Sequence, residues 1–440
     1  MIDRVLAAAR GRSDAADAMW QATERTAVSF EAGRLKAAGV TEEAGVNLRV
    51  VHGGRVGVAG TTRLDAPPAD LVECALASAT LGEALPLVFP GAAAAPAVAT
   101  ADERAVALPL DALVDTGRAL VERLTRERCQ VNVAVERAVS DAAVGSSAGA
   151  RGGYRTTAVS VSADVTRIAG DDVLMVSDYY AASAPPTAAE LDALVESITT
   201  RLELGLAIVA PPEGALPVIF TPPGLAAVLL PLEHALSGKT VLQGSSRLAD
   251  QLGATVFDER FSLTDDPLAP GRPGSRPLDD EGVPSATLPL VERGVVRQFI
   301  YDLETAARAA TRSTGHGHRG VFGKPQAGYT NLIVAGSGKR GAGSVVFGGG
   351  LLDGIRDGLL VDDLIGVGQG NVAGGAFSHP VALAYRVERG RITGRVKDAA
   401  VAGNAYDLLK RIGGFGSDGR WLGARFAPSL LLEGVSVARR

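Results

Sequence analysis

The stretch Pro222–Lys239 constrains the fold most, because it combines paired prolines, an apolar periodicity and a glycine at its end. Pro222 and Pro223 suit the start of a helix, where a missing N–H group costs little. Apolar residues then recur at steps of three and four, the spacing of one buried helical face; they are Leu225, Val228, Leu229, Leu232 and Leu236. Gly238 suits the end of that helix. We therefore expect a helix of roughly four turns that packs on the core, with a kink at Pro231.

Alternating apolar residues around glycine turns recur along the chain, and this pattern predicts antiparallel hairpins. The turns are expected at Glu31–Gly33, His52–Gly54, Glu292–Gly294 and Glu388–Gly390. Alternation over residues 130–178 predicts further strands, with a mobile glycine-rich loop at Ala143–Gly153 between them.

Helical periodicity or composition predicts helices at residues 68–81, 111–126 and 188–206. Residues 85–101 are rich in Pro and Ala and are predicted to form a linker, whereas residues 261–283 are predicted to form a long loop. The sequence therefore predicts an α+β fold of two to three domains. Their expected bounds are 1–100 for an N-terminal hairpin domain, 101–210 for a middle α+β domain and 211–440 for a C-terminal domain.

Charge and cysteine content exclude several classes of protein. Lys and Arg number 44 against 49 Asp and Glu, and no basic run indicates nucleic-acid binding. Cys74 and Cys129 are too few for a disulfide framework, which favours a reduced, cytoplasmic protein. The first residues lack the apolar core of a signal peptide, and no apolar run approaches the length of a membrane span.

Two segments contain histidines that could take part in chemistry. His316 and His318 lie in a Gly-rich run that indicates an open, flexible loop. Histidines two residues apart can share a metal ion, but two ligands are too few for a protein zinc site. His234 lies alone on an apolar helix, where a packed and hydrogen-bonded histidine is more common than a metal ligand.

The stretch Pro222–Lys239 resembles the signature helix of the TldD/PmbA family. In the catalytic TldD branch of that family, the helix contains His-Glu-x-x-x-His, which provides two zinc ligands and a general base. The resemblance places His234 at the second histidine, Leu229 at the first and Leu230 at the glutamate. A leucine can neither bind zinc nor activate water.

The same branch takes its third zinc ligand from a cysteine in a loop near the C-terminus. The matching loop here is Gly414–Gly419, which has no cysteine. The resemblance therefore implies that three metal-site positions are lost together and that this chain has neither catalytic residues nor a metal site of its own.

Residues 313–332 also resemble the family motif Thr-Gly-x-x-Arg…Pro…Thr-Asn, which lies near the substrate channel. The resemblance implies a set of substrate-channel candidates: His316, His318, Arg319, Thr330 and Asn331. A further match is the Ala-Gly-Asn run that ends at Asn404, where the asparagine is expected to cap a helix.

The resemblance covers nearly the whole chain and implies curved antiparallel sheets with flanking helices. It further implies a TldE-like accessory subunit that completes a chamber and holds unfolded peptides. A TldD-like partner would supply zinc, in a heterodimer or a dimer of heterodimers, and this chain would hold no cofactor. No nucleic acid or membrane partner is expected. Two alternatives stay open: a stand-alone peptide-binding or clamp protein without peptidase activity, and an enzyme with a rearranged site built from His234, His316 and His318.

Overall fold

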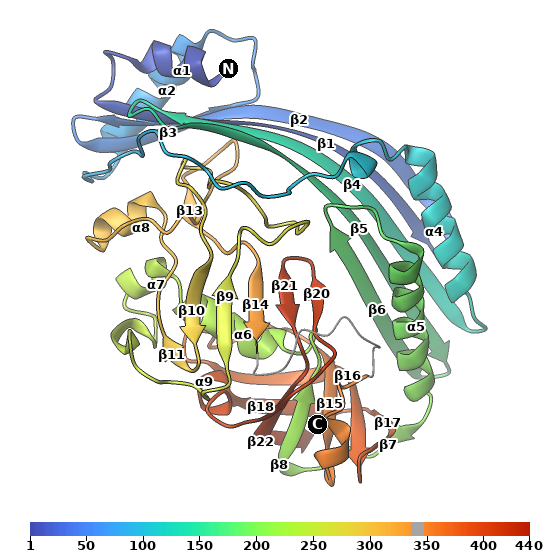
Figure 1. The fold of residues 1–440 in the computed structure, drawn as a ribbon. Coiled ribbons are helices and arrows are strands. Elements are labelled where there is room, and N and C mark those ends of the chain that lie inside the picture. The colour runs from blue at the N-terminus through green and yellow to red at the C-terminus, as the bar shows by residue number, and fades with distance from the viewer. Residues whose placement is uncertain (336–346) are drawn as a thin grey trace.

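A long curved antiparallel sheet arches over the rest of the molecule in the computed structural model of the chain (Figure 1). The structure describes residues 1–335 and 347–440. The strand order in the arch is β3-β2-β1-β4-β5-β6. The bounds are β1 Ala15–Glu31, β2 Arg34–His52, β3 Arg55–Thr61, β4 Cys129–Ser146, β5 Arg151–Ala169 and β6 Asp172–Ala182. The sheet thus takes strands from residues 1–100 and from residues 101–210.

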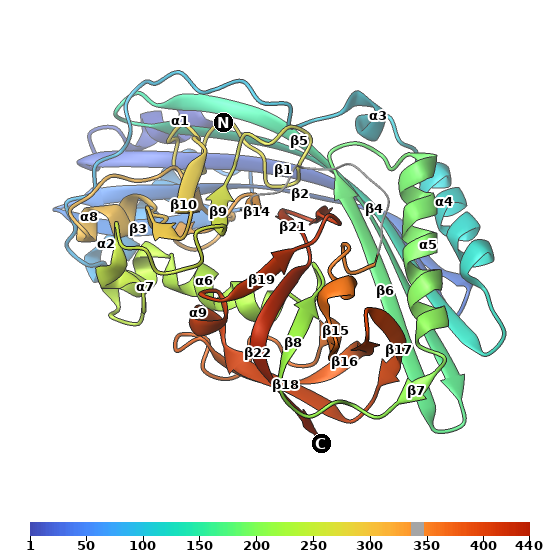
Figure 2. The same ribbon diagram turned by 60° about the horizontal axis from the view of Figure 1, so that its bottom comes forward.

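Helices cover the outer face of this arch (Figures 1 and 2). Even-numbered residues of β1 face them: Ala16 and Ala18 pack with one pair of helices, and Val28 and Phe30 pack with a second pair. The first pair is α1 Ile2–Ala9 and α2 Pro68–Leu81, and the second is α4 Leu110–Leu124 and α5 Ala188–Leu204; α3 Glu103–Val106 lies between them in the chain. The helices expected at 68–81, 111–126 and 188–206 are confirmed within a few residues.

The prediction of a mobile loop at Ala143–Gly153 was wrong. β4 continues to Ser146 and β5 begins at Arg151, so only a short turn remains between them. The Ser146 hydroxyl fixes this turn, because it accepts hydrogen bonds from the N–H groups of Ala148 and Ala150, both at 3.2 Å. Glycine content alone did not reveal this anchor.

The C-terminal half contains two larger sheets and one short two-stranded sheet. One sheet has the order β11-β10-β9-β14-β21-β20, and the other has the order β15-β8-β22-β18-β16-β17-β7, with β19 also on β22. Because β15 also pairs with β16, the second sheet closes on itself. The bounds are β7 Ile208–Val209, β8 Gly214–Phe220, β9 Ser262–Asp265, β10 Leu288–Glu292, β11 Val295–Val296, β14 Leu332–Ala335, β15 Asp357–Leu364, β16 Ala376–Glu388, β17 Arg391–Val396, β18 Ala399–Asn404, β19 Ile412–Phe415, β20 Arg420–Leu422, β21 Arg425–Ala427 and β22 Leu430–Arg439; β12 Gly317–His318 pairs with β13 Gln326–Ala327.

The expected helix of Pro222–Lys239 is divided in two. Residues 222–224 form a turn, α6 spans Ala226–Ala235, and α7 begins at Gly238 and ends at Leu242. Gly238 is not a helix end here. A Cβ atom at this position would lie 2.2 Å from the ring of Tyr301, so the glycine permits a close approach.

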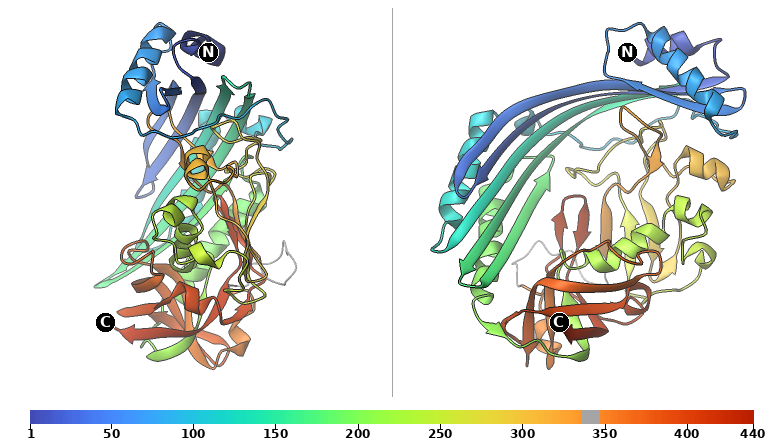
Figure 3. Two further views of the ribbon diagram at one scale, coloured as in Figure 1. Left: turned by 90° about the vertical axis from the view of Figure 1, so that its left-hand side faces the viewer. Right: turned by 180° about the vertical axis from the view of Figure 1, so that it is seen from behind.

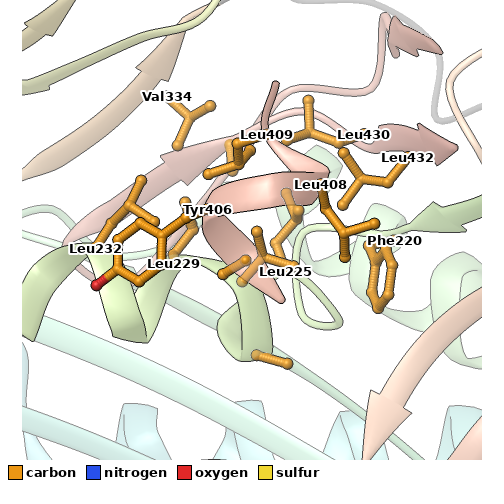
Figure 4. Packing of buried hydrophobic residues seen from close by; sticks show 14 of the residues in the cluster. Phe220, Leu225, Leu229, Leu232, Val334, Tyr406, Leu408, Leu409, Leu430 and Leu432 are labelled. Atoms are coloured by element: carbon orange, nitrogen blue, oxygen red, sulfur yellow. The ribbon is translucent and has the colours of Figure 1, made fainter. Parts of the chain in front are cut away.

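The apolar face of α6 packs in the largest core cluster, as expected. Leu225, Leu229 and Leu232 lie among side chains from α9 Ala405–Leu408 and from the closed sheet (Figure 4). Asn404 caps α9, because its side-chain oxygen accepts a hydrogen bond from the Tyr406 N–H at 3.1 Å. The α+β class with curved antiparallel sheets and flanking helices is confirmed.

The remaining loop and hairpin expectations were partly confirmed. All four glycine turns connect paired strands. Residues 261–283 were expected to be a loop, but they contain β9 and several fully buried acidic side chains. A short helix α8, Leu303–Arg308, follows β11. No helix within the described ranges is both long and apolar enough to cross a membrane.

Candidate functional site

The helix α6 contains the three positions at which the resemblance places zinc chemistry. Leu229 is 2% exposed and belongs to the apolar core. Leu230 is half-buried and faces the turn that contains Gly368. His234 is half-buried, and its Nε2 atom is buried without a hydrogen-bond partner among the described residues. The hydrogen bond expected for His234 is therefore not found at that atom.

These residues do not fit a zinc ion. An aliphatic side chain sealed in an apolar cluster offers no lone pair to a metal. In the loop Gly414–Gly419, Asp418 is already used, because its carboxylate accepts hydrogen bonds from the N–H and hydroxyl of Ser429 at 2.9 and 2.6 Å. Across residues 1–335 and 347–440, no group of three His, Cys, Asp or Glu side chains is placed to hold a metal ion.

Glu233 precedes His234 on α6 and is ion-paired. Its carboxylate contacts Arg425. Burial raises the pKa of Glu233, and the nearby Arg425 opposes that rise. The main-chain oxygen of Glu233 accepts a hydrogen bond from the Tyr329 hydroxyl at 2.6 Å, which links α6 to the segment 313–332.

The segment 313–332 is not the open loop that its glycines suggested. His316 is 0% exposed. Its Nε2 lies 2.9 Å from the Asp265 carboxylate and its Nδ1 lies 2.8 Å from the Thr314 carbonyl oxygen. Both ring nitrogens therefore face oxygen atoms of the chain itself. Asp265 also accepts from the N–H and hydroxyl of Thr330, at 2.8 and 2.5 Å.

His318 faces a cation rather than a second metal ligand. The Arg276 guanidinium lies 2.9 Å from its Nε2 and 3.3 Å from its Nδ1. Burial and then Arg276 lower the pKa of His318 to about 4. An arginine at the ring nitrogens repels a metal ion, so this histidine pair does not resemble a metal site.

Asn331 is fully buried and joins two parts of the preceding loop. Its Nδ2 donates to the Asp266 carbonyl at 2.8 Å and to the Ser275 hydroxyl at 2.9 Å, while its Oδ1 accepts from the Gly274 N–H at 3.1 Å. The structure thus places all five channel candidates in one buried or half-buried region with partners inside the chain. Contact with substrate stays a prediction for each of them.

Arg319 belongs to a group that we call the inner charge cluster: Asp17, Arg49, Glu281 and Arg319. Arg49 donates to both oxygens of Asp17, at 3.0 and 2.7 Å, and to Glu281 at 2.7 Å. Arg319 donates to Asp17 at 3.3 Å. All four side chains are almost fully buried. The cluster therefore joins the inner face of the arch to two loops of the C-terminal half.

The protonation of this cluster follows from burial and pairing. Burial alone would raise the pKa of Asp17, but Arg319 and Arg49 together hold it below its ordinary value. Burial raises the pKa of Glu281 to about 7, against the opposing effect of Arg49. The second oxygen of Glu281 accepts a hydrogen bond from the Leu303 N–H at 2.7 Å, at the start of α8.

Asn47 completes this contact between arch and loop. Its Nδ2 donates to the carbonyl oxygens of Val321 and Gly323, at 3.1 and 3.0 Å. Sequence analysis missed Asp17, Arg49 and Glu281. For Asp17 and Arg49 the available signal was a charged residue at an inward position of a strand, since such a charge needs a partner when buried. Glu281 lies in a loop, where no such pattern was present.

Comparisons with known proteins agree with this architecture. Residues 213–439 match the model of the PmbA/TldA metallopeptidase C-terminal domain, which is just over half of the chain. This chain belongs to the PmbA/TldD family. Residues 16–81 also match PmbA/TldA metallopeptidase domain 1, which covers β1 to α2 of the arch.

Curated relatives of this PmbA/TldD-family chain are named as metalloproteases. A metalloprotease of Methanothermobacter thermautotrophicus is 32% identical over 212 residues, which cover 48% of this chain and 44% of the relative. A metalloprotease PmbA homolog of Haemophilus influenzae is 30% identical over 198 residues, covering 44% of this chain and 40% of the relative. The chain thus matches less than half the length of either relative.

Solved structures show the same fold over the whole chain. TldE from Thermococcus kodakarensis has a TM-score of 0.88 at 22% identity and covers 99% of both chains. A putative modulator of a DNA gyrase from Thermotoga maritima has a TM-score of 0.88 at 24% identity, again with 99% of both chains covered. At these identities the likeness establishes the fold alone.

Proposed function

We propose that this PmbA/TldD-family chain is the accessory, non-zinc subunit of a two-subunit metallopeptidase that acts on unfolded peptides. The position of Leu229 carries the proposal: where the catalytic branch has its first zinc-binding histidine, this chain has a leucine sealed in the apolar core. In this proposal a TldD-like partner supplies zinc, the water that it activates and the general base. The chain completes the chamber and holds substrate in a cytoplasmic complex.

The solvent-accessible inner face of the arch suits the holding of an extended peptide. Polar side chains alternate with buried ones along β5, where Ser160 and Ser162 are half-buried between fully buried neighbours. The main chain of β5 is already paired with β4 and β6, so these short side chains would provide the contacts to the peptide. Hydroxyl groups both donate and accept hydrogen bonds, which suits many peptide sequences.

The first measurement is the zinc content of the chain purified alone and purified with a TldD-like partner. We expect no bound zinc in the first sample and zinc with chelator-sensitive peptidase activity in the second. About one tightly held zinc per isolated chain would contradict the proposal. Peptide binding that neither needs nor changes with the partner would instead favour a stand-alone clamp.

A second test restores two of the lost side chains. The double variant Leu229→His/Leu230→Glu should bind no zinc tightly and should cleave no peptide alone, because its third ligand is still missing. Zinc binding and peptide cleavage by the isolated double variant would mean that the site is not degenerate. Leu230→Glu alone is the matched control, because it tests the charge on α6 without adding a ligand to the core.

A further inference from the structure

The rim of the arch contains a strand edge that no other described strand covers. β2 runs from Arg34 to His52, but β3 pairs only with its second half, from Val46 to His52. The first half is bonded to β1 on one side, and within the described ranges its other side has no strand partner. Figures 1 and 3 place this part of β2 along the border of the arch.

Residues 34–43 of β2 are all exposed, on both faces of the strand. An edge of this length presents a row of free N–H and C=O groups, which is a template for pairing with another strand. Two large apolar side chains add to it: Leu35 is 49% and Val40 is 53% exposed. Both the main chain and the side chains of this rim therefore lack the cover that the second half of β2 has.

Charges along the rim are divided by sign. Arg34 and Lys36 lie at the start of β2, whereas Glu42 and Glu43 lie near the middle of the strand. Neither glutamate has an ion-pair partner among the described side chains, and Glu42 lies directly opposite Glu24 of β1 in the strand register. Glu24 is itself paired with Arg137, so Glu42 and Glu43 are the charges at this end of the rim that an added cation would pair.

We propose that a second copy of this chain pairs with residues 34–44 as an antiparallel strand about a two-fold axis near Gly39. Such an axis brings Lys36 of each copy opposite Glu42 of the other, in place of its exposed partner Glu31 at 3.0 Å. Arg34 lies opposite Ala44 on the same face and therefore diagonal to that Glu42. The same surface on both copies is then self-complementary, as a two-fold interface requires. The six-stranded arch becomes part of a sheet that is continuous across two chains, and the exposed Leu35 and Val40 gain cover.

This pairing is independent of the accessory-subunit proposal. If both hold, the rim joins two copies in a dimer of heterodimers, and zinc content and self-association are measured separately. Charged residues on an edge strand can also prevent pairing. If the charges of this rim prevent pairing, the unmodified chain is a monomer, whereas the proposed pairing predicts a dimer.

The test is the oligomeric state of the full chain, measured by sedimentation over a wide range of concentration, with charge-swapped variants. We expect a dimer that dissociates on dilution. Arg34→Glu/Lys36→Glu makes the rim wholly acidic, and Glu42→Lys/Glu43→Lys makes it wholly basic. Each variant should weaken the dimer by roughly tenfold or more. An equal mixture of the two variants should restore it, since the signs are again complementary.

Two further measurements separate this surface from others. Hydrogen exchange of residues 34–44 should slow as the concentration of the unmodified chain rises. The control variant Lys410→Glu/Arg439→Glu reverses exposed charges far along the chain and should leave the dimer unchanged. A monomer at every concentration, or a dimer that both rim variants leave intact, would overturn the proposal, as would pairing of this edge with the TldD-like partner alone.

Discussion

Arg49 is the cation that holds two buried carboxylates at once, those of Asp17 and Glu281. Replacing it by methionine keeps much of the side-chain volume but leaves Glu281 without its cation. We expect Arg49→Met to lower the free energy of unfolding by about 3–5 kcal/mol, because an unpaired buried charge is strongly destabilising. Urea unfolding of the two proteins measures the difference.

The control for Arg49 is an exposed pair. Arg12 and Glu73 lie 3.4 Å apart with side chains that are 37% and 70% exposed, so Arg12→Met should cost less than about 1 kcal/mol. The double variant Arg49→Met/Glu281→Gln removes the carboxylate as well and should recover part of the loss. Equal losses in Arg49→Met and Arg12→Met would show that the inner charge cluster does not stabilise the fold.

Glu281 gives the protein a pH dependence of stability with a definite sign. The pKa of Glu281 is about 7 in the folded protein, compared with an ordinary value of 4.5, because the effect of burial outweighs that of Arg49. The protonated group therefore stabilises the fold fully below pH 4.5, and this contribution is lost as the pH rises through 7. From pH 4.5 to 7 this one proton should lower the free energy of unfolding by at most about 1.4 kcal/mol per pH unit. His318, whose pKa is lowered to about 4, opposes that decline below pH 6.5, so the contribution of Glu281 is measured as the difference between the unmodified chain and Glu281→Gln.

The variant Glu281→Gln should flatten that decline, because glutamine does not titrate. Burial raises the pKa of Asp279 in the same direction, so a smaller slope remains in the variant. The pKa of Asp17 is lowered, and its contribution is lost only as the pH falls below its ordinary value of 3.8, outside this window. Glu292→Gln, at an exposed ion pair, is the control. An unchanged slope in Glu281→Gln would contradict the assignment.

Leu229, Leu230 and His234 could be named from the sequence because the helix that contains them resembles a family motif, and such a motif is local in the chain. Sequence patterns could not pair Arg49 with Asp17 or with Glu281, since these partners lie 32 and 232 residues away along the chain. Strand alternation indicates which face a residue occupies, but the loop that meets that face is decided by the tertiary fold. The glycines around His316 suggested flexibility, whereas buried acceptors hold the ring in place.

Among the elements, β3 and the loop after β12 depend on one glycine contact. A Cβ atom at Gly60 of β3 would lie 1.9 Å from the carbonyl oxygen of Val321. Gly60→Ala must therefore move the loop away from the arch, and we expect a loss of roughly 1–3 kcal/mol. Thermal unfolding measures it. Gly320→Ala is the matched control in the same loop, because nothing lies within 4 Å of its added Cβ atom.

Element types were predicted better than element ends. The helix at 68–81 was placed correctly because glycine follows its apolar run and proline precedes it. The helix expected over Pro222–Lys239 ends early, at Ala235, because Gly238 must pack against Tyr301 and its N–H must reach the Ile300 carbonyl at 2.9 Å. That contact joins segments that are distant in the sequence, so no local sequence pattern predicts it.

Across the whole molecule, two of the buried ion clusters that join the arch to the C-terminal half lie at separate places. One is the inner charge cluster on β1 and β2. The other lies at the β6 border, where Arg201 of α5 contacts Asp178 of β6 at 3.1 Å and Asp362 of β15 at 2.8 Å. The Tyr385 hydroxyl donates to the Arg201 carbonyl oxygen at 2.8 Å and ties β16 into the same cluster.

These two buried ion clusters should open independently of each other. Arg201→Met leaves Asp362 without a cation and should increase hydrogen exchange in β6 and α5. Residues 317–323, which contain Arg319 of the inner charge cluster, should keep their protection. Because the sites share no partner, the unfolding losses of Arg201→Met and Arg49→Met should add within about 0.5 kcal/mol in the double variant. Arg123→Met, which breaks an exposed pair with Asp192, is the control on the same helices. Exchange that rises equally at both ends in Arg201→Met would mean that the arch and the C-terminal half separate as one cooperative unit.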